Sequence, residues 1–215
     1  NVGRSGTMTT YLEGSLTYNR IFDEQHRVGA LFLYNQKIHT NTQADNGDDA
    51  LPYKHQGLAG RLTYAFRDTY FAEFNMGYNG SENFARGHRF GFFPAGAIGW
   101  MVSNEKWFEP VTNVIDVLKL KASYGLVGND DIGGQRRWVY ESTIVNGGSW
   151  NYGQNGNEGG QGIVVGEVEN LSASCEEALK LNAGFELSLF EKVKIQADYF
   201  REKRSGIFLQ RSGLP

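Results

Sequence analysis

The amino-acid sequence predicts an all-β protein in which about eight antiparallel strands cross a membrane as a segment of a β-barrel. Three observations point to this fold class. Apolar and polar residues alternate with a period of two in several segments, which is typical of strands. The clearest segments are about ten residues long, the length that crosses a bilayer at a tilt. Short and long connections alternate along the chain, as they do between the two ends of a membrane barrel.

Composition excludes several other classes. The chain has 215 residues, of which 40% are hydrophobic, with 28 glycines and a net charge of −3. No run approaches the roughly 18 consecutive apolar residues of a membrane-spanning helix. The acidic balance argues against a nucleic-acid partner, which requires a basic face. Cys175 is the single cysteine, so the chain has no internal disulfide and no multi-cysteine metal site.

The strongest segment is a hairpin from Gly57 to Tyr78. Its first arm places large apolar residues on one parity, and after Arg67 and Asp68 the second arm does the same. Because side chains of a strand alternate between faces, the hairpin has one apolar and one polar face. The apolar residues of the two arms are Leu58, Leu62, Tyr64 and Phe66, then Tyr70, Ala72, Phe74, Met76 and Tyr78.

The remaining elements are assigned in the same way. A helical turn is expected at Asn104–Phe108, ending before Pro110, and a local strand is expected around Arg137–Val145 inside an otherwise irregular stretch. Pro94 in a glycine-rich strand indicates a bulge or the first pairs of a ladder. The other strands are expected at residues 9–20, 26–38, 91–102, 118–126, 179–189 and 193–199, and the long loops at residues 39–56, 79–89 and 128–174.

Alternation by itself does not say which face is inside. A soluble antiparallel sandwich also alternates, with its apolar side chains in a core. In that alternative Leu58, Phe74 and Leu120 fill the core, and the chain is a soluble or surface-attached domain that binds glycans or serves as an adhesin scaffold. Solubility without detergent distinguishes the two alternatives.

Three runs carry a resemblance to a known family. The runs at residues 91–100 (GFFPAGAIGW, followed by Ser103-Asn104-Glu105), 118–129 (LKLKASYGLVGN) and 177–186 (EALKLNAGFE) resemble strands of the SusC-type TonB-dependent transporters of Bacteroidetes outer membranes. They occur in the family's order across most of residues 57–205. This resemblance implies that the apolar face contacts lipid.

The resemblance also implies the rest of the assembly. Family members have a barrel of about 22 strands closed by a plug, capped by a SusD-like lipoprotein and energised through TonB. Residues 1–215 would then be part of the barrel domain, with the plug, the TonB-contacting segment and the closing strand outside this chain. The expected function is import of oligosaccharides across the outer membrane, with oligopeptides as the alternative. The expected lumen-facing residues are Arg61, Glu73, Lys119, Lys121, Glu186 and Asp198.

Candidate ligand-binding residues lie in the longest loop. Trp138, Tyr140, Trp150 and Tyr152 occur there among asparagines and glutamines. Aromatic faces stack on sugar rings and amides bond their hydroxyls, which favours an oligosaccharide. In the alternative interpretation these aromatic residues pack the loop against its neighbours or against the partner lipoprotein.

No metal, cofactor or catalytic site is expected. The cluster Asp45–Asp49 groups oxygen donors around a glycine but lacks the spacing of a calcium loop, and Asn129–Asp131 is similar. The four histidines, His26, His39, His55 and His88, lack metal-ligand spacing. The sequence has neither Gly-x-Ser-x-Gly nor a phosphate-binding glycine loop, so it does not indicate an enzyme.

Overall fold

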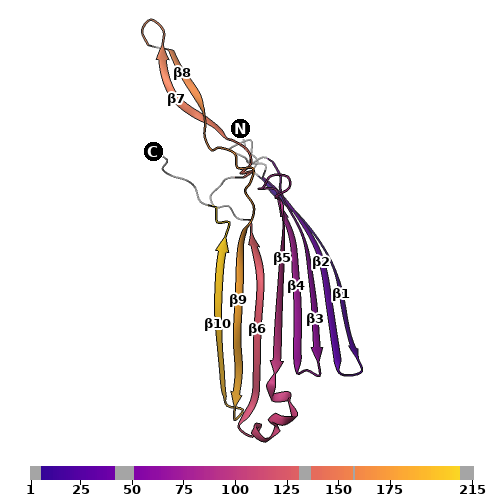
Figure 1. The fold of residues 1–215 in the computed structure, drawn as a ribbon. Helices are drawn as coiled ribbons and strands as arrows, with labels where there is room; N and C mark the ends of the chain where they lie inside the picture. The colour runs from indigo at the N-terminus through magenta and orange to yellow at the C-terminus, as the bar shows by residue number, and fades with distance from the viewer. Residues whose placement is uncertain (1–5, 42–50, 131–136, 157, 209–215) are drawn as a thin grey trace.

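The computed structural model describes residues 6–41, 51–130, 137–156 and 158–208. Eight strands form one antiparallel sheet in the order β1-β2-β3-β4-β5-β6-β9-β10, in which sequence neighbours are also spatial neighbours except across the β6–β9 junction. The predicted all-β, eight-stranded antiparallel architecture is confirmed (Figure 1). The strands are β1 (Thr7–Phe22), β2 (His26–Asn41), β3 (Tyr53–Phe66), β4 (Tyr70–Ser81), β5 (Phe90–Met101), β6 (Ile115–Asn129), β9 (Glu176–Leu189) and β10 (Val193–Ser205).

The register follows the alternation of the sequence. Leu62 lies opposite Phe74, and Tyr124 lies opposite Leu181, so apolar residues of different strands share a face. The β5–β6 ladder ends at Ala95, next to Pro94, as expected for a residue that cannot donate a backbone hydrogen bond. Most strands extend one to several residues beyond a predicted bound because hydrogen bonding continues past the last alternating residue, whereas β5 ends at Met101, one residue before its predicted end.

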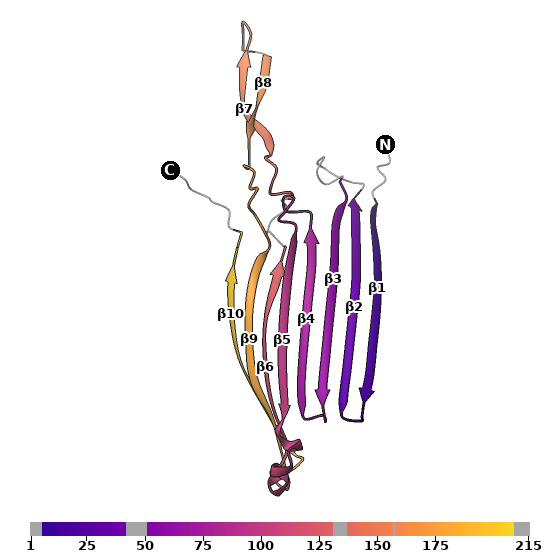
Figure 2. The same cartoon turned by 45° about the vertical axis from the view of Figure 1, so that its right-hand side comes forward.

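Connections are segregated by length between the two ends of the sheet. The β1–β2, β3–β4 and β9–β10 turns lie at one end, which we call the turn end, and the longer connections lie at the other, the loop end (Figure 2). The two central residues of each tight turn have φ between 49° and 55°, the left-handed conformation of type I′ turns that suits the twist of paired strands. These residues are Asp23 and Glu24, Arg67 and Asp68, and Phe190 and Glu191.

One turn-end connection is longer. Between β5 and β6 the chain forms two short 3₁₀ helices, η1 (Val102–Asn104) and η2 (Lys106–Val111). The predicted helical turn is present, but Pro110 lies inside η2 instead of stopping the helix before it. The fixed φ of proline suits a helical conformation, and in so short a helix its missing N–H costs little.

The structure corrects the interpretation of the longest loop. The strand expected around Arg137–Val145 is wrong, because residues 137–143 are irregular. The paired strands are β7 (Ile144–Tyr152) and β8 (Glu158–Val165), which form a separate hairpin that projects beyond the loop end of the sheet (Figures 1 and 2). Its register shifts between Asn146 and Ser149. Gly147 and Gly148 at this shift remove the alternation by which a strand is recognised in sequence.

The described residues form a single layer with little buried core. The buried apolar residues gather at the two ends of the sheet: Val102 and Phe108 near the turn end, and Phe84, Ala85, Trp138 and Val139 at the loop end. In the described part of the chain no helix has the length and hydropathy needed to cross a membrane.

Candidate functional site: an apolar belt, a polar face and a projecting hairpin

The apolar face of the sheet is uncovered. Phe74 is 44% exposed and Leu181 is 38% exposed, and no second layer packs on them among the described residues. A soluble sandwich would bury this face against another sheet. A contiguous apolar surface of this extent marks contact with lipid or another protein. Its exposed large residues include Leu16, Phe32, Leu62, Phe74, Phe92, Ile98, Leu120, Tyr124, Leu181, Phe185 and Ile195.

Aromatic rings border the apolar face at both ends. At the turn end Tyr70 stacks between Phe66 and Trp100, with ring centroids 6.4 Å apart in each pair. At the loop end Tyr78 stacks on Phe90 with centroids 5.1 Å apart. Trp100 and Phe90 are ends of one strand, about 33 Å apart at 3.3 Å per residue, or roughly 25 Å along the membrane normal for a strand tilted by about 40°. This separation matches the apolar band of outer-membrane barrels.

The turn-end aromatic residues also direct their polar atoms outward. The Tyr70 hydroxyl donates to Glu105 Oε1 at 2.5 Å, and Trp100 Nε1 donates to the same oxygen at 3.1 Å. Amphipathic rings of this kind favour the boundary between lipid and water, where one part is apolar and the other part is hydrated. The aromatic residues therefore mark the predicted edge of the belt.

The opposite, polar face carries charges in pairs. Arg61 lies 2.7 Å from Glu73, which also accepts a hydrogen bond from Asn75. Lys121 lies 3.1 Å from a carboxylate oxygen of Glu186 and 3.1 Å from one of Asp198. Five of the six residues expected to face the lumen thus meet in ion pairs on this face. The sixth, Lys119, lies over the ring of Phe71, 5.7 Å from its centroid.

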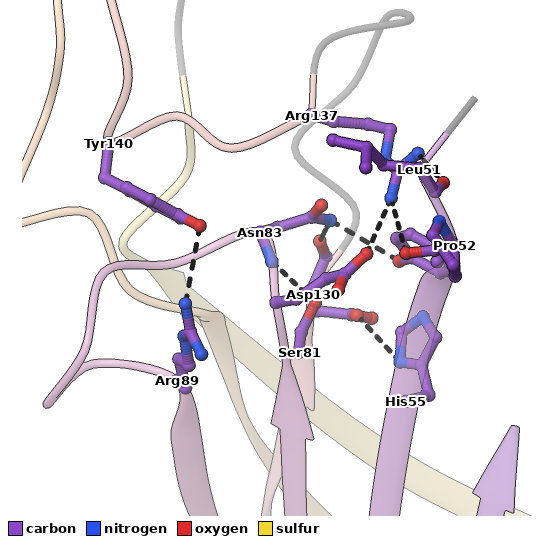
Figure 3. A network of polar contacts seen from close by, with 11 residues as sticks. Leu51, Pro52, His55, Ser81, Asn83, Arg89, Asp130, Arg137 and Tyr140 are labelled. Atoms are coloured by element: carbon purple, nitrogen blue, oxygen red, sulfur yellow. Dashed lines mark hydrogen bonds and ion pairs between the residues drawn. The ribbon is translucent and has the colours of Figure 1, made fainter. Parts of the chain in front are cut away.

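A polar cluster at the loop end fixes the base of the projecting hairpin (Figure 3). Arg137 donates to the backbone carbonyls of Leu51 and Pro52 at 2.8 and 3.1 Å and forms an ion pair with Glu82 at 2.6 Å. The side chains of Arg137 and Glu82 are 16% and 17% exposed. A largely desolvated guanidinium with several acceptors holds its geometry firmly. The cluster therefore ties the start of β3 and the β4–β5 loop to the chain that leads into β7.

Apolar packing supports this cluster. Phe84 and Val139 are almost fully buried, and the Val139 N–H donates to Asn83 O at 3.2 Å. On the way back from the hairpin, the Asn170 N–H donates to Val139 O at 2.7 Å. The segments that precede and follow the hairpin are therefore attached to the same small core. We call these contacts, with those of Arg137, the hairpin root.

The structure divides the four predicted ligand residues into two pairs. Trp138 is 9% exposed and lies under Arg137, with its ring 4.4 Å from the guanidinium carbon, while the Tyr140 hydroxyl accepts from Arg89 at 3.4 Å. These two residues belong to the hairpin root. Trp150 and Tyr152 lie on β7 and are 55% and 50% exposed. The fold does not bring the two pairs together.

Trp150 and Tyr152 form an aromatic surface on the hairpin. They are two residues apart on one strand and therefore share a face. The indole lies over Gly160 and Gly162 of β8, where an added Cβ would approach Trp150 ring atoms to 2.8 and 3.0 Å. Glycine at these positions lets the indole lie against the backbone with its other side open.

The charged residues of the region around the hairpin are all acidic. Between residues 138 and 179 the sequence has no lysine, arginine or histidine, and it has six glutamates. Asparagine, glutamine and serine supply most of the remaining polar side chains of the hairpin. An uncharged ligand rich in hydroxyl or amide groups suits such a surface better than an anionic one.

Sequence reasoning missed the hairpin root. Leu51 and Pro52, Glu82 and Asn83, and Arg137 come from three separate irregular segments, and no spacing connects them. The one signal in the sequence is an arginine beside a tryptophan within a glycine-rich stretch. The candidate oxygen cluster Asp45–Asp49 and residue 131 of the Asn129–Asp131 cluster lie outside the described residues.

Comparisons with known proteins agree with this geometry. The chain matches no protein-family model. It is 28% identical over 153 residues to the TonB-dependent receptor P3 of Formosa agariphila, which is 71% of this chain and 14% of that receptor. It is 38% identical over 74 residues to the TonB-dependent receptor SusC of Bacteroides thetaiotaomicron, which is 34% of this chain and 7% of SusC.

Solved structures of a peptide importer have a similar fold. The RagAB peptide importer in its closed-closed state matches 92% of this chain with a TM-score of 0.71 and 19% sequence identity, over 24% of that chain. The open-open state matches 91% with a TM-score of 0.68. This chain spans less than a quarter of the length of each of these relatives and structures. The predicted resemblance to SusC-type TonB-dependent receptors is confirmed.

Proposed function

We propose, from the resemblance of this chain to the SusC-type TonB-dependent receptors, that it forms part of the barrel wall of an outer-membrane nutrient importer. The observation that carries the proposal is the two-faced sheet: an apolar belt of membrane thickness on one side, and paired charges on the other. A wall between lipid and a water-filled lumen requires this arrangement. The wall has no catalytic task, and the names of the relatives describe receptors and importers.

The edges of the sheet support a larger barrel. The outermost strands, β1 and β10, have 16 and 13 residues, and each is paired on one side within the described chain. Long unpaired edges attract further strands, and a membrane barrel removes them by closing. We therefore place residues 1–215 in the barrel domain, with further strands and a plug supplied by the remainder of the protein.

The imported nutrient is an oligosaccharide in this proposal. Trp150 and Tyr152 present an open aromatic surface among uncharged amides, and this combination suits sugar rings and their hydroxyls. The hairpin projects from the loop end, which in outer-membrane barrels faces the exterior, so it meets ligands before they enter the lumen. A SusD-like lipoprotein at the cell surface and TonB from the inner membrane complete the importer.

Alanine substitution of Trp150 tests ligand capture. The Trp150→Ala change removes an exposed ring outside the sheet, so the protein should fold normally while its affinity for the oligosaccharide falls about tenfold, as expected for loss of one stacking contact of about 1–1.5 kcal/mol. The measurement is calorimetric titration of the purified full-length complex. Leu171→Ala, at an exposed position of the segment that returns from the same hairpin, serves as the matched control. Equal affinity of the Trp150 variant and the wild type would contradict the role of the hairpin.

Oligopeptide import is the second candidate. It is favoured by the likeness of this chain to RagAB, a peptide importer with the same fold. The two candidates differ in what binds: an uncharged oligosaccharide in the first, an extended peptide in the second. Growth of a deletion strain on single glycans or on defined peptides as sole carbon source separates them.

A further inference from the structure

A cavity on the polar face near the loop end has properties of a ligand subsite. It has a volume of about 190 Å³ and includes the His55–Asp130 pair in its lining. Pockets for complete drug-sized ligands measure about 300–1,000 Å³, so this cavity suits one unit of a longer ligand. Its lining includes Asn35, His55, Asn79, Ser81, Phe93, Gly128, Asp130 and Cys175.

Two of the lining residues, Asn35 and Asn79, belong to a row of alternating asparagines and glycines that crosses the sheet. Asn35, Gly57, Asn79 and Gly91 lie opposite one another in register across β2, β3, β4 and β5. A Cβ on Gly57 would lie 2.6 Å from Oδ1 of Asn79 and 2.9 Å from Oδ1 of Asn35. The two amides therefore lean toward each other over the bare backbone of Gly57, and any other residue there would push them apart.

These amides are available for a ligand. Neither Asn35 nor Asn79 makes a side-chain hydrogen bond to another described residue, although Gly57 between them is buried. Each amide offers two donors and one acceptor with two lone pairs. Asn35 is half-buried and Asn79 is exposed, so water reaches at least one of the amides, and a ligand with closely spaced hydroxyls can take the place of that water at both.

The walls of the cavity add an apolar plate and a polar end. The Phe93 ring covers both Gly91 and Gly128, because a Cβ on either glycine would collide with it. At the far side His55 Nδ1 lies 3.4 Å from Asp130 Oδ2, and this buried oxygen accepts no hydrogen bond from the described residues (Figure 3). A flat ring beside several hydrogen-bonding groups is the combination that holds a pyranose.

We propose that this cavity is a subsite for one uncharged sugar unit on the lumen wall, with Asn35 and Asn79 bonding its hydroxyls and Phe93 contacting its ring. The lining has no lysine or arginine, and its histidine is already paired with Asp130, so nothing in it attracts a carboxylate or sulfate. The proposal rests on the proposed import of oligosaccharides. It adds a second contact point, on the barrel wall, to the one on the hairpin.

The test uses the full-length importer, purified in detergent together with the lipoprotein that accompanies it. Maltohexaose, cellohexaose, laminarihexaose, mannohexaose and xylohexaose are titrated calorimetrically, with a hexa-alanine peptide blocked at both ends as the non-sugar probe. The wild type is compared with Asn79→Ala, with the Asn35→Ala/Asn79→Ala double variant, and with Asn182→Ala as control. Asn182 is an asparagine of the polar face on β9 and does not line the cavity.

At least one hexasaccharide is expected to bind the wild type. The single variant should raise its Kd roughly fivefold and the double variant roughly tenfold or more, as for one and two lost hydrogen bonds, while Asn182→Ala leaves Kd unchanged. Bound sugar should also slow maleimide labelling of Cys175, which lines the cavity. Labelling is followed by mass spectrometry of the peptide that contains Cys175.

The remaining outcomes separate this inference from the proposed function. If a hexasaccharide binds but the asparagine variants bind it equally well and Cys175 is not protected, the subsite is disproved while oligosaccharide import stands. If no hexasaccharide binds the wild type, both proposals fail. If the alanine peptide binds and the asparagine changes weaken its binding, the cavity is a peptide site and the assignment to sugar is overturned.

Discussion

The eight-stranded sheet and the β7–β8 hairpin expose large apolar residues in different ways. On the sheet these residues lie on one face, within a belt bounded by aromatic rings. At the base of the hairpin they lie on both faces: Ile144 and Val165 on one, Val145 and Val164 on the other, all at least 46% exposed. A one-sided belt fits a lipid boundary, whereas a two-sided apolar ribbon outside the belt fits contact with other molecules.

The two regions also differ in what stabilises them. Every inner strand of the sheet is paired on both sides, while the hairpin has two strands, and an isolated two-stranded hairpin is marginally stable in water. The hairpin root compensates by fixing both of its chains. The comparison implies that the stability of the sheet depends on its lipid-facing residues, whereas the stability of the hairpin depends on its attachment to the hairpin root.

The largest effect is expected from a charge placed in the belt. Tyr124 lies in the same register row as Phe74 and Leu181, near the middle of the belt. The Tyr124→Arg change should destabilise the folded protein in a bilayer by about 2–4 kcal/mol. The measurement is reversible unfolding of the full-length protein in lipid vesicles with a denaturant.

Ser123→Arg is the matched control for that change. Ser123 is the neighbouring residue and lies on the polar face. An arginine there meets water, so its stability should stay within about 0.5 kcal/mol of the wild type, as for ordinary surface changes. Equal destabilisation by both substitutions would remove the distinction between the two faces.

A smaller and local effect is expected at the hairpin root. Arg137→Gln leaves the carboxylate of Glu82 without its cation in a largely buried position, which should cost roughly 2 kcal/mol locally. We expect faster hydrogen exchange and proteolysis at residues 137–175 with unchanged protection of β1–β6. Arg86→Gln, at an exposed arginine of the β4–β5 loop, should leave exchange unchanged. Loss of protection throughout the sheet would show that the hairpin and the sheet are one cooperative unit.

The smallest effect concerns the junction where the hairpin returns to the sheet. Burial raises the pKa of the Cys175 thiol, and the negative charge of Asp130 raises it further. Because the thiolate is the reactive form, alkylation of the folded protein should be slower than that of the urea-unfolded chain near pH 8 and should approach it as the pH rises. Asp130→Asn should shift this profile toward lower pH. Identical profiles for folded and unfolded protein would place the thiol in water.

Sequence reasoning succeeded where one face alternates without interruption. The hairpin of β3 and β4 follows from the parity of residues such as Leu62 and Phe74, since each strand must present one face to lipid and one to water. The same reasoning placed Arg61, Glu73 and Lys121 on a common face, where the structure shows them in ion pairs.

The loop region could not be predicted in this way. The glycines at 147 and 148 shift the register of β7, so its apolar residues follow no period, and the sequence pattern predicts the strand too early in the chain. The two tryptophans of this loop are the same residue type but have different surroundings in the structure. Trp138 is fixed by Arg137, whereas Trp150 lies on two glycines. Contacts between segments that are far apart in sequence decided which of them is buried.

Spin labels at Phe74 and Asn75 test the central claim most directly. Each residue is replaced in turn by a labelled cysteine in the full-length protein, in which Cys175 is first changed to serine, and collision rates with oxygen and with a water-soluble nickel chelate are measured in lipid. The two-faced wall predicts high oxygen and low nickel accessibility at position 74, and the reverse at position 75. Low accessibility to both reagents at position 74 would mean that Phe74 is buried in protein, and the assignment of the apolar face to lipid would be contradicted.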